Sequence, residues 1–338
     1  MICSLCYKLS FALFFLLVSI VVPGAVLADD DVPAGATKLS IVATTGMVAD
    51  VARHVAGDRA EVVSIMGEGV DPHLYKPKTS DVRRILAADV VFYNGLKLEG
   101  RMGEVFTRAR SRGRPVHAVT AGLPTAVLLE DESAVGHPDP HVWMDVKTWA
   151  LTLEEVARVL CEIDPSSCST YQANAAKALD SMLQLHESVT LMIASIPENQ
   201  RVLVTAHDAF RYFGRAYDME VRGIQGISTE SEAGLSDLNG LVEFLVERRI
   251  PAVFVESSVP RKNVQALIEG AKARGHDVVV GGELFSDAMG RPGTQEGTYE
   301  GMIEHNARTM TEALGGRTIQ VGDETAVGLS SDENPVGP

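Results

Sequence analysis

The stretch Ser169–Ile196, STYQANAAKALDSMLQLHESVTLMIASI, decides the fold of this chain. Its apolar residues recur every three or four positions, as on one face of an α-helix: Tyr171, Ala175, Leu179, Met182, Leu185, Val189, Met192 and Ile196. At about 1.5 Å per residue such a helix is roughly 40 Å long, enough to cross a whole domain. The sequence therefore predicts one long, stiff helix near the middle of the chain.

The limits and faces of this helix are also predicted. A second apolar set, Ala178, Leu183 and Leu191, indicates a buried face wider than that of a surface helix. Ser167 or Ser169 can cap its start, and Pro197 ends it because proline disfavours a helical residue before it.

Strand and helix patterns alternate on both sides of the long helix. Strands are predicted at 39–43, 60–66, 90–93 and 115–119 before it, and at 201–205, 219–223, 252–256 and 278–280 after it. Helices predicted between them include Lys147–Cys161 and His207–Tyr217. This alternation is typical of parallel sheets with helices on both faces.

We therefore predict an α/β fold of two (β/α) lobes with parallel sheets, joined by one long rigid helix. The predicted parts are a signal peptide at 1–28, an N-terminal lobe at 37–166, a linking helix at 167–197, a C-terminal lobe at 198–318 and a flexible tail at 319–338.

The N-terminus has the pattern of an export signal. Lys8 precedes the apolar run Phe11–Val22, and Val26-Leu27-Ala28 fits cleavage after Ala28. The alternative is an uncleaved membrane anchor, but this run has 12 residues, against the roughly 20 that a spanning helix needs. A lipoprotein would need a cysteine at the cleavage site. We therefore expect a periplasmic or otherwise exported protein.

Charge and cysteine content narrow the possible functions. The chain has 30 basic and 45 acidic residues, which argues against a nucleic-acid partner, since duplex binding depends on clustered Lys and Arg. Outside the leader only Cys161 and Cys168 remain. In an oxidising compartment they can form a local disulfide, or they stay as two free thiols.

Four polar residues lie at the carboxyl ends of predicted strands, where open α/β sheets bind ligands. They are His73, His141, His207 and Asp287. A single loop histidine is more often solvated than a ligand. The joint pattern is stronger evidence, because each lobe supplies two such groups.

Five separated motifs carry a family resemblance: Gly69–His73, Asp139–Trp143, Thr205–Phe213, Val255–Ser258 and Gly282–Gly290. With them the chain resembles the metal-binding solute-binding proteins of zinc and manganese ABC importers (cluster A-I, TroA-like branch). The resemblance implies a metal ion between two lobes, held by His73, His141, His207 and Asp287. It also implies a membrane permease as partner, and we expect a monomer.

The donor set favours Zn²⁺, because imidazole and carboxylate suit it and it has no geometric preference. Mn²⁺ and Fe²⁺ are the alternatives, since abundance can overrule affinity order. Neutral imidazoles are needed, so affinity should fall below about pH 6.5. Glu256 is predicted to hold the outer nitrogen of a ligating histidine; otherwise it is a buried glutamate that bridges loops.

Three functions remain open at this point. The first is a non-enzymatic receptor that captures Zn²⁺ or Mn²⁺ and delivers it to the permease. The second is a metal-dependent hydrolase with Glu283 as base, but four protein ligands would close the metal shell that catalysis needs open. The third is a surface adhesin on the same fold.

Overall fold

The computed structural model describes residues 38–131 and 136–318. The predicted signal peptide at 1–28 and tail at 319–338 lie outside these ranges. Within them, no helix is both long enough and apolar enough to cross a membrane.

The first lobe is built on a parallel four-stranded sheet in the order β2-β1-β3-β4. Its strands are β1 (Leu39–Ala43), β2 (Ala60–Ser64), β3 (Val90–Tyr93) and β4 (Val116–Ala118). Its helices are α1 (Gly46–Ala56), α2 (Thr79–Ala87) and α3 (Gly103–Ser111).

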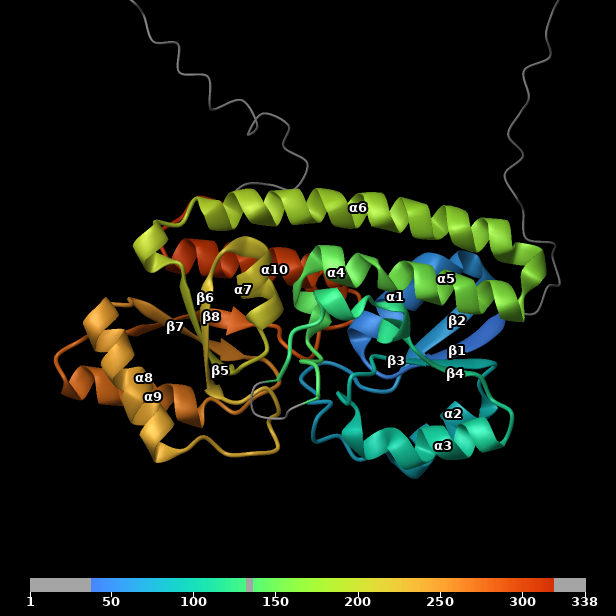
Figure 1. The fold of residues 1–338 in the computed structure, drawn as a ribbon, viewed down its shortest axis with the longest axis horizontal. Helices are drawn as coiled ribbons and strands as arrows, with labels where there is room; N and C mark the ends of the chain where they lie inside the picture. Colours follow the sequence, from blue (N-terminus) through green and yellow to red (C-terminus); the bar gives the residue numbers. More distant parts are fainter. Residues whose placement is uncertain (1–37, 132–135, 319–338) are drawn as a thin grey trace, which may run out of the picture. The chain divides into compact units, whose positions relative to one another are not determined.

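Helices cover both faces of this sheet because successive side chains of a strand point to opposite faces. Ile41 and Phe92 join the core that contains α1, whereas Val42 and Val91 pack with residues of α2 and α3. Figure 1 shows α1 on one side of the sheet and α2 with α3 on the other.

The second lobe repeats the parallel strand–helix pattern. Strand β5 (Val202–His207) pairs with β6 (Glu220–Gln225), and β7 (Ala252–Glu256) pairs with β8 (Val279–Leu284), both in parallel. The helices are α7 (Arg211–Tyr217), α8 (Leu235–Arg248), α9 (Lys262–Ala273) and α10 (Tyr299–Ala313). The predicted α/β class with parallel sheets is therefore confirmed.

The long helix is α6 (Cys168–Ala194), 27 residues. It packs against α1 and α10, and against α4 (Val146–Ala150) and α5 (Thr152–Ile163), and so contacts both lobes (Figure 1). The predicted wide buried face is wrong, because Leu183 and Leu191 are 37% and 45% exposed. Both lobes lie on one side of α6, so only one stripe of it is covered. Ser167 occupies the N-cap, one of the two predicted positions, but its side chain makes no capping hydrogen bond.

Two further helix predictions need correction. The expected helix at 147–161 is two helices, α4 (Val146–Ala150) and α5 (Thr152–Ile163). Leu151 keeps helical angles between them but its N–H bonds Thr148, three residues back, so the i−4 ladder is interrupted. The other predicted helix begins at Arg211, because His207 is still paired with Gln225 as the last residue of β5.

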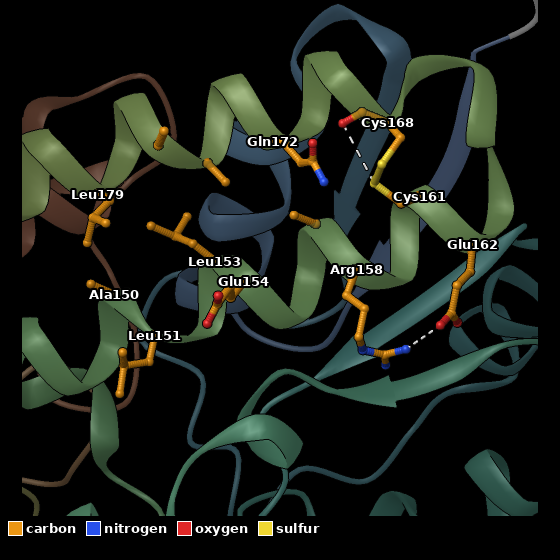
Figure 2. Close-up of a pocket in the computed structure, with 13 residues that line it drawn as sticks. Ala150, Leu151, Leu153, Glu154, Arg158, Cys161, Glu162, Cys168, Gln172 and Leu179 are labelled. Carbon is orange, nitrogen blue, oxygen red and sulfur yellow. Dashed lines mark hydrogen bonds and ion pairs between the residues drawn. A yellow bond between two sulfur atoms is a disulfide. The ribbon is translucent and has the colours of Figure 1, made fainter.

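A disulfide joins the end of α5 to the start of α6, between Cys161 and Cys168. The disulfide lies at one end of the groove between these two helices, which Figure 2 shows. This is the bonded alternative of the two that the sequence left open.

One apolar core runs through both lobes and the long helix. Its members include Ile41, Met47 and Phe92 of the first lobe, Tyr171 and Met182 of α6, and Phe213, Tyr299 and Met302 of the second lobe. The two lobes are therefore held together by shared packing as well as by α6.

Candidate metal centre

The four residues singled out in the sequence meet at one point. One ligand atom each from His73, His141, His207 and Asp287 lies within 4.8 Å of the others, and all four residues are buried. His73 follows β2, His207 ends β5 and Asp287 follows β8. The site is therefore at the carboxyl ends of strands, where the predicted topology places a ligand.

The separations of these atoms fit a small cation at their centre. His141 Nε2 lies 3.3 Å from His73 Nε2 and 3.3 Å from Asp287 Oδ1, and His207 Nε2 lies 3.3 Å from Asp287 Oδ2. Zinc bonds of about 2.0–2.2 Å give tetrahedral edges of about 3.3–3.6 Å. These three separations fit the edges of a four-coordinate metal shell.

Several of these donor atoms have no other use. Within residues 38–131 and 136–318, His207 Nε2 and both carboxylate oxygens of Asp287 are buried without a hydrogen bond. A buried polar atom without a partner costs about 1–3 kcal/mol. A metal ion bound here would satisfy all three.

Two of the histidines are held from behind by buried carboxylates. Glu256, at the end of β7, accepts from the backbone N–H of His207 (2.8 Å) and contacts its Nδ1 (2.5 Å). This contact with the outer nitrogen of a ligating histidine is the one predicted for Glu256 from the sequence. The carboxylate fixes the ring so that Nε2 faces the metal centre.

Asp139, which was not predicted from the sequence to have this role, does the same for His141. Its Oδ1 lies 3.0 Å from the backbone nitrogen of His141 and 2.7 Å from Nδ1 of the ring. The signal was present in the chain, since Asp-Pro-His occurs twice, at 71–73 and at 139–141.

The first tripeptide is arranged differently. Asp71 Oδ1 accepts from the backbone N–H of His73 at 2.8 Å, but its Oδ2 accepts from the Thr229 hydroxyl of the second lobe at 2.6 Å. In the described part of the chain, no carboxylate holds the outer nitrogen of the His73 ring. His73 is thus positioned through its backbone and the lobe contact.

These surroundings give the three histidine ligands different pKa values. Burial alone lowers the pKa of His141, but Asp139 and Asp287 outweigh it and raise the pKa to about 9. The pKa of His207 is likewise raised well above its ordinary value, by Glu256 and Asp287 against burial. Burial dominates at His73, and its pKa falls to about 4.

Asp287 is the anionic ligand of the set. Burial favours its protonated form, but the neighbouring histidines, His207 first, hold the pKa of its carboxyl well below the usual range. Without a metal ion, Asp287 therefore carries a negative charge that His141 and His207 balance with protons.

Further hydrogen bonds cross between the lobes beside His141 and Asp287. The Trp143 indole N–H donates to the Ser286 carbonyl at 2.9 Å, and the Tyr212 hydroxyl donates to the Asp139 carbonyl at 2.9 Å. These bonds fix the His141 loop relative to Asp287 and α7. Glu283, the base of the hydrolase alternative, is instead paired with Arg261 at the surface.

A family profile described as "Zinc-uptake complex component A periplasmic" matches residues 41–313 of this chain. The chain belongs to this family.

Curated relatives agree with this membership in the zinc-uptake component A family. The chain is 46% identical over 277 residues to the zinc-binding protein TroA of Treponema pallidum, covering 82% of this chain and 89% of that protein. It is 44% identical over 277 residues to the manganese-binding lipoprotein MntA of Bacillus subtilis, covering 82% and 90%.

A solved structure places the fold in the same family. The periplasmic zinc-binding protein TroA from Treponema pallidum superposes with a TM-score of 0.79 at 45% identity, covering 82% of this chain and 99% of that one. The family resemblance and the two-lobed fold inferred from the sequence are thus confirmed.

Proposed function

We propose that this chain is the solute receptor of an ABC importer. It captures a divalent metal ion with His73, His141, His207 and Asp287 and delivers the ion to a membrane permease. One observation carries the proposal: four buried donor atoms from both lobes lie within 4.8 Å of one another, and in the described ranges His207 Nε2 and both Asp287 oxygens have no hydrogen bond.

The proposed ion is Zn²⁺. Three imidazole nitrogens and one carboxylate are ligands that zinc binds well, and the spacing fits its usual four-coordinate shell. Mn²⁺ prefers more oxygen ligands and binds more weakly at a given nitrogen site. Mn²⁺ and Fe²⁺ remain the competing cargoes, and relatives of similar identity are named for zinc and for manganese.

The permease must distinguish the loaded receptor from the empty one. Because a ligand shifts an equilibrium only through differential contacts, the ion acts by joining His73 and His141 of the first lobe to His207 and Asp287 of the second. We propose that the receptor works as a monomer outside the cytoplasmic membrane, after cleavage behind Ala28, and that it catalyses no reaction.

Elemental analysis of the protein purified from its native compartment tests the cargo. About one equivalent of zinc supports the proposal, whereas stoichiometric manganese or iron would replace zinc as the cargo. Calorimetry of the Asp287→Ala variant tests the site itself. Loss of the tight binding step is expected, and an unchanged affinity would rule out these four ligands.

A further inference from the structure

A second group of metal-ligand side chains lies apart from the four ligands described above. Asp50 and His54 are one turn apart on α1, and Glu300 lies in the first turn of α10. One ligand atom of each lies within 4.8 Å of the others. Helix α1 belongs to the first lobe and α10 to the second, so this group spans the lobe junction.

The two contacts of His54 in this group are long for hydrogen bonds and leave room for a shared cation. His54 Nε2 lies 3.5 Å from Asp50 Oδ2 and 3.6 Å from Glu300 Oε1. Both exceed the roughly 2.7–2.9 Å of a hydrogen bond between a charged ring and a carboxylate. They match the tetrahedral edge of about 3.3–3.6 Å that zinc bonds produce.

The surroundings orient one ligand and leave the others accessible. Asp50 is buried, and its Oδ2 accepts the backbone N–H of Tyr299 at 3.0 Å, which fixes the carboxylate against the start of α10. The side chains of His54 and Glu300 are 37% and 27% exposed. A cavity of about 400 Å³ opens beside Asp50, which lines it together with Arg53.

We propose that Asp50, His54 and Glu300 form a second divalent-metal site, which takes Zn²⁺ and ties α1 to α10. Three protein ligands leave one position of a tetrahedral shell to water. Arg53 Nη1, 3.9 Å from Asp50 Oδ1, adds an opposing positive charge. This site is therefore weaker than the buried one and fills only when zinc is abundant.

Zinc titration of the full chain separates the two sites. Two calorimetric steps are expected, a tight one and a weaker one. Asp287→Ala should remove the tight step and keep the weaker one, and His54→Ala should do the reverse, with at least about a tenfold loss at the weaker site. Survival of the tight step in Asp287→Ala would count against the proposed cargo site alone.

The weaker step needs its own controls. Glu300→Gln is a second variant that spares the Asp50–Tyr299 contact, and it should also weaken this step. His305→Ala removes another partly exposed histidine from α10 and should leave both steps unchanged. A weaker step that survives both His54→Ala and Glu300→Gln, or a wild-type chain that binds one zinc only, would overturn the inference.

Hydrogen exchange tests the tie between the helices. With excess zinc, amides in the first turns of α10 should exchange more slowly in the wild type and in Asp287→Ala. His54→Ala should show no such protection. Equal protection in His54→Ala would mean that zinc acts elsewhere, and the proposed site would be abandoned.

Discussion

The two Asp-Pro-His tripeptides share a sequence and a backbone contact but differ in what the aspartate does next. In both, the carboxylate accepts the backbone N–H of the histidine. Asp139 is fully buried and also holds the His141 ring, whereas Asp71 turns its second oxygen to Thr229 of the other lobe. The same three residues therefore give one ligand fixed within its lobe and one that depends on a contact between lobes.

This difference appears in the chemistry of the rings. The pKa of His141 is raised to about 9, and that of His73 is lowered to about 4. At neutral pH the metal-free protein therefore has a protonated His141 and a neutral His73. An incoming ion finds His73 ready to bind but must displace a proton from His141.

Removing either histidine ring should have the largest effect on zinc affinity. We expect His73→Ala and His141→Ala each to lower the affinity by more than the 10–100-fold that is typical of losing an outer hydrogen-bond partner, measured by calorimetry with zinc. His141→Ala should also lower the melting temperature, because it leaves the buried charge of Asp139 unpaired, a loss of about 3–5 kcal/mol. His73→Ala should melt near the wild type; an equal loss of stability would contradict the distinction.

Changing the two aspartates should have a smaller effect. Asp139→Asn keeps the shape but weakens the hold on the His141 ring, and about 10–100-fold lower zinc affinity is expected. Asp71→Asn is the matched control, because its amide oxygen still accepts the His73 N–H and its amide NH2 can donate to the Thr229 hydroxyl oxygen. A loss of the same size in both variants would mean that the two tripeptides act alike.

The pH dependence should follow the protons on His141 and His207. The pKa of His141 is raised to about 9 and that of His207 is also raised, so the metal-free protein retains both protons at neutral pH and zinc affinity should rise with pH to at least about 9. The expected slope is about tenfold per pH unit for each proton displaced. This window lies higher than the pH 6.5 expected from an ordinary imidazole.

Calorimetry in buffers of different ionisation enthalpy counts the released protons and checks this prediction. Proton release at pH 7 should fall in Asp139→Asn and stay unchanged in Asp71→Asn. Zinc binding without proton release at pH 7 would contradict the assignment.

The smallest expected effect concerns the lobe contact of the first tripeptide. Thr229→Val removes the hydroxyl that donates a hydrogen bond to Asp71 and keeps the side-chain shape. Loss of this bond should cost about 1 kcal/mol of binding free energy, or roughly fivefold in zinc affinity. Faster zinc release in stopped-flow chelation should account for it. An unchanged release rate would show that this contact does not hold His73 in place.

Much of the fold and of the site could be predicted from local patterns. β1 and β7 follow from buried β-branched runs, and the four proposed ligands from their position after strands. What failed depended on tertiary neighbours: the exposure of Leu183 and Leu191 is set by which side of α6 the lobes occupy. The role of Asp139 was missed because spacing alone cannot show which oxygen faces a ring.

The core that continues from one lobe into the other limits how the ion can be unloaded. Separating the two lobes would expose buried aromatic side chains of the shared core, such as Phe213 and Tyr299, to water. The free-energy cost would be about 1.5–3 kcal/mol for each side chain. The segment that carries His73 is instead joined to the second lobe by the Asp71–Thr229 hydrogen bond, while Val70 and Tyr75 beside it pack on the core of the first lobe. Release of the ion by movement of this segment would leave the shared core closed.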